Sequence, residues 1–127
     1  MTRSQDLREL LARLGSQEYC YLTTAGRKTG RPHEIEIWFG AHSSTLYLLS
    51  GSEKSDWLKN LRQNPAVKVR IAEHTFSGMA RLVSDPEEDR LARYRVAEKY
   101  QEWEDGKTLS QWAQTALPVA IDLEPHS

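Results

Sequence analysis

Residues 23–32 hold the densest set of groups in this chain that are suited to binding an anion. Gly26 and Gly30 permit positive φ and close approach of the backbone to a ligand, so successive N–H groups can converge on an anion. Three cations within five residues suit phosphate or carboxylate, and threonine hydroxyls add donors. The stretch predicts a clamp for a phosphorylated cofactor; the alternative is a solvated hairpin tip whose charges only aid solubility. The candidate contacts are Thr24, Gly26, Arg27, Lys28, Thr29, Gly30, Arg31 and Pro32.

The segments on either side of this stretch predict two strands joined by a tight loop. Residues 18–24 are mainly apolar, and residues 34–39 alternate in character. The alternation places the isoleucines on one strand face and Glu34, Glu36 and Trp38 on the other.

The rest of the chain predicts short helices and further strands. Leucines at helical spacing indicate an N-terminal helix within residues 1–16, and Asp85, Pro86 and Glu88 form a capping box that starts a longer helix. Gly78 predicts a strand bulge. Helices are also expected at 55–64 and from Thr108, strands at 45–50, 66–71, 76–84 and 119–123, and turns at 40–44 and 73–75. The pattern predicts a small, mainly antiparallel barrel with flanking helices, of the α+β class, as a single domain over residues 1–127.

Composition favours an ordinary globular protein and argues against a nucleic-acid partner. Hydrophobic residues make up 39% and charged residues 28%, and the net charge of −1 gives no overall basic field. No apolar run approaches the ~20 residues of a membrane span, and the N-terminus is typical of an amphipathic helix, not of a signal sequence. We therefore expect a cytoplasmic protein without an integral membrane segment. Cys20, alone in an apolar run, is interpreted as a core residue, and four scattered histidines lack metal-ligand spacing.

Three motifs occur in order along the chain: residues 22–32, residues 57–65 with a Trp, an Asn and a closing Asn-Pro, and residues 115–119. Together they resemble the deazaflavin-dependent nitroreductase and quinone reductase family, whose split β-barrel is related to that of flavin reductases. Three ordered motifs are far more specific than a lone glycine loop. The resemblance implies a split β-barrel and an oxidoreductase that uses the deazaflavin coenzyme F(420), with FMN as the alternative cofactor of some split-barrel relatives.

The resemblance also implies how a cofactor would lie. The loop cations would meet its phosphate and the carboxylates of a glutamate tail. Ser50, Gly51 and Ser52 would approach its flat ring closely, and Trp57 and Asn60 would bound the ring. The implied reaction is hydride transfer from the reduced deazaflavin coenzyme to a small-molecule acceptor such as a quinone, a nitro compound or an enone, with the protein supplying orientation and a dry pocket.

This chain departs from the family's pattern just after the second glycine. Many members carry Gln-Pro-Arg there, whereas Arg31, Pro32 and His33 stand here, followed by Glu34 and Glu36. The two glutamates would oppose the coenzyme's acidic tail, unless strand alternation points both away from it. We interpret His33, like the other histidines, as a surface or turn residue.

Aromatic residues are the candidates for the acceptor side of the site. The proposed substrate pocket holds Trp38, Tyr100 and Trp103. For Trp38 two interpretations stay open, stacking on a ligand ring and packing under a helix. For Tyr100 and Trp103 the competing interpretation is packing against the core.

Two other functions stay open from the sequence. One is an FMN-binding flavin reductase-like protein. The other is a non-catalytic nucleotide- or RNA-binding module that uses the Gly-Arg-Lys loop, although the net charge and the lack of a wider basic stripe argue against it. The apolar strand faces and four Trp residues exceed what one small core requires, and split-barrel relatives often pair, so we expect a homodimer.

Overall fold

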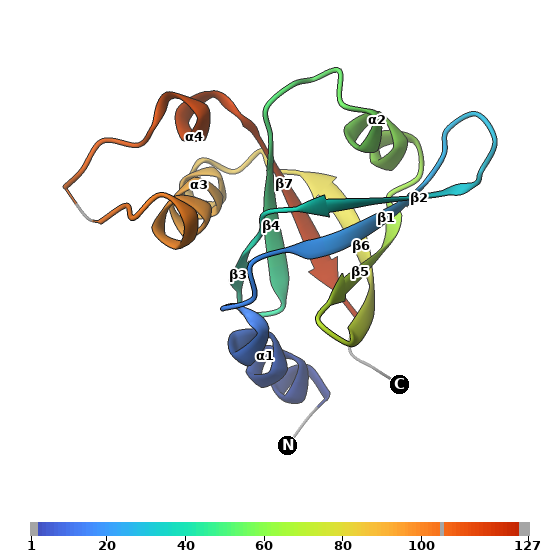
Figure 1. The fold of residues 1–127 in the computed structure, drawn as a ribbon, viewed down its shortest axis with the longest axis horizontal. Coiled ribbons are helices and arrows are strands. Elements are labelled where there is room, and N and C mark those ends of the chain that lie inside the picture. Colours follow the sequence, from blue (N-terminus) through green and yellow to red (C-terminus); the bar gives the residue numbers. More distant parts are fainter. Residues whose placement is uncertain (1–2, 105, 125–127) are drawn as a thin grey trace.

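The computed structural model describes residues 3–104 and 106–124, which form a curled antiparallel sheet with helices at its ends and against one side (Figure 1). The strand order is β2-β1-β5-β6-β7-β4-β3. The strands are β1 (Cys20–Ala25), β2 (Pro32–Ile37), β3 (Gly40–His42), β4 (Thr45–Ser50), β5 (Ala66–Ile71), β6 (His74–Leu82) and β7 (Leu117–Leu123). The helices are α1 (Arg3–Leu14), α2 (Asp56–Gln63), α3 (Pro86–Tyr100) and α4 (Gln111–Thr115). The α+β class and the antiparallel half-barrel are as predicted.

The sheet is split at the step from β2 to β3. These strands lie at opposite ends of the ladder, although only Trp38 and Phe39 separate them in sequence. The expected strand 34–39 and turn 40–44 were therefore wrong in their boundaries. The backbone of Phe39 forms its hydrogen bonds with side chains of α3 and not with a neighbouring strand. Its N–H donates to the Tyr100 hydroxyl over 3.1 Å, and its carbonyl accepts from Lys99 Nζ over 3.2 Å.

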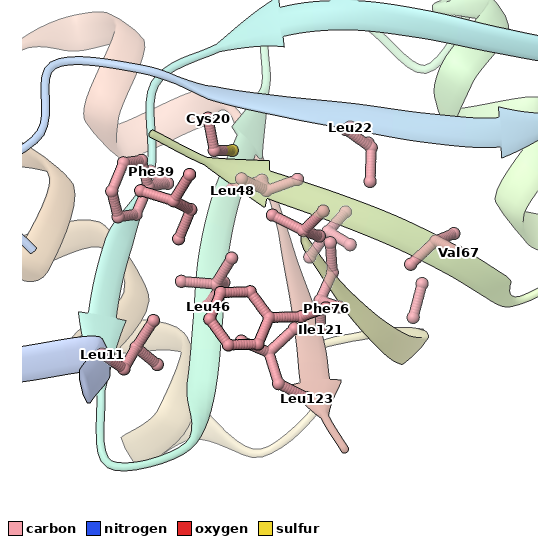
Figure 2. Packing of buried hydrophobic residues seen from close by; sticks show 14 of the residues in the cluster. Leu11, Cys20, Leu22, Phe39, Leu46, Leu48, Val67, Phe76, Ile121 and Leu123 are labelled. Atoms are coloured by element: carbon pink, nitrogen blue, oxygen red, sulfur yellow. The ribbon is translucent and has the colours of Figure 1, made fainter. Parts of the chain in front are cut away.

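The core fills the concave side of the sheet, where side chains from most strands meet those of α1 and α2. Figure 2 shows Leu46, Leu48, Phe76 and Ile121 packed together there. Cys20 is fully buried in this cluster, and burial raises the pKa of its thiol to about 12. The thiol is thus protonated and unreactive at neutral pH, which confirms its interpretation as a core residue.

β6 differs from the expected strand 76–84. It begins at His74, inside the expected turn, and its continuous register with Val67 and Leu123 leaves no bulge at Gly78. A Cβ at Gly78 would lie 2.8 Å from Ile121 Cγ2. Glycine therefore serves here to let β6 and β7 approach closely.

The start of α3 follows the predicted cap only in part. The Asp85 carboxylate accepts the Glu88 N–H over 2.9 Å, but the Glu88 side chain does not return to the cap and instead binds Arg81 and Tyr47. The short helix α4 is capped by Ser110 and not by Thr108. None of the described helices has the length and apolar character needed to cross a membrane.

Arg81 joins three elements by binding two carboxylates. Its Nη2 lies 2.7 Å from Glu88 Oε2 on α3, and its Nε lies 2.7 Å from Asp122 Oδ2 on β7. The Tyr47 hydroxyl on β4 also donates to Glu88 over 2.8 Å. Hydrogen bonds from Arg81 are the main cause of a lowered pKa at both Glu88 and Asp122, so the folded protein favours their charged forms.

Acidification is expected to weaken the fold through this network. Because both pKa values are lowered by folding, the stabilisation is present above the unfolded-state values and is lost as the pH falls through the folded-state values, below about pH 4. The carboxylates are 21% and 48% exposed, so solvent screening limits the effect to about 1 kcal/mol. Urea unfolding at neutral pH and at about pH 3 should show a smaller loss of stability for Arg81→Gln than for the unmodified protein. Equal losses of stability in Arg81→Gln and the unmodified protein would contradict this account. The control is Arg90→Gln, which removes an exposed cation of α3 and should lose as much stability as the unmodified protein does.

Candidate functional site

A cleft of about 470 Å³ opens between the glycine loop (residues 26–31), the start of β2 and the start of α2. In Figure 1 this loop projects beyond β1 and β2 on the side of the molecule that carries α2. The cleft brings together predicted cofactor contacts from two motifs that are about thirty residues apart in sequence. Its lining residues are Thr24, Gly26, Arg27, Lys28, Thr29, His33, Glu34, Ile35, Asp56, Trp57 and Asn60.

Asn60 anchors the glycine loop to α2. Its side chain is 3% exposed, its Nδ2 donates to Thr24 Oγ1 over 3.1 Å, and its Oδ1 accepts from both the backbone N–H (3.2 Å) and Nη1 (2.9 Å) of Arg27. Its amide thus makes three hydrogen bonds within the protein. Asn60 positions the loop and also lines the cleft, so its contact with a cofactor ring stays a prediction.

The guanidinium group of Arg27 is fixed before any ligand arrives. Besides Asn60 it meets Asp56 Oδ1 at 3.3 Å, and it keeps 27% of its side chain exposed toward solvent. Within the loop, the Gly26 N–H donates to the Arg31 carbonyl over 2.7 Å and the Gly30 N–H donates to the Gly26 carbonyl over 2.8 Å. These bonds hold the loop in one shape, but they and two side-chain bonds use the N–H groups of residues 26, 27, 30 and 31 within the protein. This corrects the expectation that successive backbone N–H groups converge on an anion, and leaves the Arg27 and Lys28 side chains as the main donors, held in place before binding.

The two loop glycines serve different purposes. Gly30 has φ of 74°, the left-handed conformation predicted for it. Gly26 is not in that conformation, which corrects half of the expectation. A Cβ on Gly26 would lie 2.8 Å from His33 Nε2 and 3.2 Å from the Arg31 carbonyl oxygen, so the imidazole and the loop backbone both pack closely against this position.

Glu36 does not oppose an anion in the cleft. Its carboxylate accepts the Tyr21 hydroxyl over 2.9 Å, away from the concave side. Glu34 lies at the rim of the cleft and 3.8 Å from Arg70 Nη2, which in turn lies over the Tyr21 ring. Strand alternation places both glutamates on the outer face of β2. Glu34 nevertheless reaches the rim of the cleft, where Arg70 offsets part of its charge.

The predicted ring-contacting loop at residues 50–52 does not line the cleft. Ser50 is buried, and its hydroxyl donates to the Ser52 carbonyl over 2.7 Å and lies 3.2 Å from Ser55 Oγ. A Cβ at Gly51 would lie 3.2 Å from Trp112 Nε1, so the close approach there is to an indole. Gly30 and Pro32 line a second hollow of about 330 Å³ beside β5 and β6, and Arg31 is exposed and lines neither space.

The predicted substrate aromatics separate into two groups. Trp38 stacks on Tyr100 with ring centroids 4.4 Å apart and meets Trp112 edge-on. This favours packing for Trp38, since Tyr100 is the last residue of α3 and burial raises its pKa to about 12. Trp103 instead stacks on Tyr94 with ring centroids 4.3 Å apart, and its indole N–H donates to the Lys107 carbonyl over 2.8 Å.

His33 and Asp56 are cleft residues that we did not predict as contacts. The alternation of β2 contained the signal for His33, which shares a strand face with Ile35. Asp56 is signalled only by its place in the first turn of α2. Among the described residues, no group of three or more His, Cys, Asp or Glu side chains could hold a metal ion.

Comparison with known proteins gives a family and a fold. The family model described as F420H(2)-dependent quinone reductase matches residues 2–124. A conserved hypothetical protein from Mycobacterium tuberculosis has a similar structure, with a TM-score of 0.75, 24% identity, and coverage of 89% of this chain and 77% of that chain.

Two further solved structures share the architecture. A FAD-binding protein from Mesorhizobium loti has a TM-score of 0.65 at 22% identity, covering 91% of this chain and 88% of its own. A structure described as an F420-H2 dependent reductase has a TM-score of 0.64 at 20% identity, and the match covers 84% of this chain and 94% of that chain. At these identities the likeness establishes the split-barrel fold.

Proposed function

The chain belongs to the F420H(2)-dependent quinone reductase family, and from that premise we propose that the cleft beside Asn60 binds its coenzyme. The family makes the protein an oxidoreductase whose coenzyme is F(420). We further propose that the acceptor is a quinone, a nitro compound or an enone. The observation that carries the assignment of the site is the cationic loop that Asn60 and Asp56 hold over the cleft.

The chemistry of the cleft fits a flat ring joined to an anionic chain. One side presents Ile35 and Trp57, which are both packed against the core and suit an aromatic ring. The other side presents Arg27, Lys28 and the hydroxyl of Thr29, which suit phosphate and carboxylate. Lys28 forms no ion pair with any described carboxylate, so its ammonium group is free for a ligand.

The residues of this chain would act by binding and orientation. Arg27 and Lys28 would hold the anionic chain, while Trp57 would fix the plane of the ring. The reduced coenzyme, when bound, supplies the hydride for the acceptor. A cytoplasmic location is part of the proposal.

Parallel fluorescence titrations at one salt concentration test the choice of cofactor. FMN ends in a single phosphate that the glycine loop could satisfy alone, whereas the deazaflavin coenzyme extends further as carboxylates. With Glu36 turned away, we expect the deazaflavin coenzyme to bind at least about tenfold more tightly than FMN, or ~1.4 kcal/mol. FMN binding that is equal or tighter would favour the flavin reductase-like alternative.

We also propose that the protein is a homodimer. The exposed Met79 and Leu82 both lie on β6, and Met79 also lines the second hollow near Gly30. Burial of this apolar surface would stabilise a pair of subunits. Light scattering should report twice the chain mass at about tens of micromolar, a range suited to an interface of ordinary size. A monomer mass at that concentration would contradict the proposal.

A further inference from the structure

His33 is a titratable side chain of the cleft to which the proposed function assigns no role. We infer that His33 is a pH-sensitive anion contact, which strengthens binding of the coenzyme when its imidazole is protonated. This inference rests on the proposed function, because the anion in question is the phosphate or the acidic tail of the coenzyme.

The register of the sheet directs His33 toward the cleft. His33 lies directly opposite Thr24 in the β1–β2 ladder, and residues in such a pair project from the same face. Thr24 is 1% exposed and bonds to Asn60 on the inner side. The imidazole therefore lies on the side of the anion loop, with Nε2 packed against Gly26.

The charged residues around His33 determine how its protonation would change the net charge of the cleft. The charged residues that line the cleft with it are Arg27, Lys28, Asp56 and, at the rim, Glu34. Arg31, two positions before it in sequence, is exposed and lies outside this lining. Asp56 already pairs with Arg27, and Glu34 lies 3.8 Å from Arg70 Nη2. An added imidazolium would therefore raise the net positive charge in the cleft, and histidine side chains change charge near ~pH 6.5.

The first test compares coenzyme binding by the unmodified protein and by His33→Gln from about pH 5.5 to about pH 8. The ratio of their dissociation constants at each pH cancels the ionisation of the free coenzyme, which both proteins share. We expect the variant to bind about tenfold more weakly at the acidic end and nearly as well at the alkaline end. His42→Gln, at an imidazole on β3 beside Arg95, should keep a ratio near unity throughout.

A second test measures the protonation of the His33 ring directly. Proton NMR of the unmodified protein, with the His33 signal identified by its absence in His33→Gln, follows the ring resonance against pH. Linkage requires the midpoint to move to higher pH when coenzyme is added, by about one pH unit for a tenfold effect.

The outcomes separate the inference from the function on which it rests. A dissociation-constant ratio that does not change with pH, or a midpoint that coenzyme leaves unmoved, would overturn the role of His33 alone. A failure of the unmodified protein to bind the coenzyme at any pH would overturn the proposed function together with this inference.

Discussion

Replacing Arg27 and Lys28 together by alanine should weaken binding of coenzyme F(420) by about a hundredfold or more. Each side chain offers a charge-assisted contact of ~1.5–3 kcal/mol, and two such losses multiply the dissociation constant to that extent. The loss of binding free energy should exceed that expected for two isolated charged contacts, because Arg27 also binds Asn60 and Asp56 and so holds the loop in place. Binding by the unmodified protein should weaken as salt is added, and the variant should show a shallower dependence.

The control for this variant removes the same charge elsewhere. Arg8 and Arg13 are exposed on α1, away from the cleft. Their joint replacement by alanine should leave the dissociation constant within about twofold, since charges farther apart than a Debye length are largely screened. If the Arg27 and Lys28 variant bound the coenzyme as tightly as this control does, the anion clamp would have no part in binding.

Asn60→Ala should lower both stability and coenzyme affinity. The substitution removes three hydrogen bonds and leaves the buried Thr24 hydroxyl and the Arg27 N–H without the partner they now have. Unsatisfied groups of this kind cost ~1–3 kcal/mol. Urea unfolding should show that loss, and a loop released from α2 should bind the coenzyme at least about tenfold more weakly.

The matched control is Asn64→Ala, at the C-cap of the same helix. Asn64 is exposed, and its Oδ1 accepts one bond, from the Ala66 N–H over 3.3 Å. We expect a smaller loss of stability, about 0.5–1.5 kcal/mol for one hydrogen bond, and unchanged coenzyme binding. Equal effects of the two variants on affinity would show that Asn60 does not position the loop.

The parts of the fold that local patterns encode were predictable. Alternating residues identified β2 and β5, and the Asp85 cap identified the start of α3, because these signals depend on neighbours a few residues away. The glycine loop was predictable for the same reason. Trp57 and Asn60 of the second motif line the cleft beside this loop, which agrees with the resemblance.

The contacts that the sequence did not reveal join residues far apart in the chain. Asn60 reaches Thr24 across 36 positions, and no local pattern shows that its amide would hold a loop in place. The Phe39 peptide leaves the strand because Tyr100, 61 positions away, binds it. The close contact between Gly26 and the His33 ring becomes visible only once the β1–β2 register is known.

The most direct test of the account is turnover without oxygen. The protein is mixed with the reduced deazaflavin coenzyme and a quinone, and the appearance of the oxidised coenzyme is followed by its absorbance. We predict that the unmodified protein and the Arg8 and Arg13 control will accelerate this oxidation alike. We also predict that the Arg27 and Lys28 variant will lose about a hundredfold in kcat/KM. A rate with the unmodified protein no greater than the rate without protein, across quinone, nitro and enone acceptors, would contradict the account.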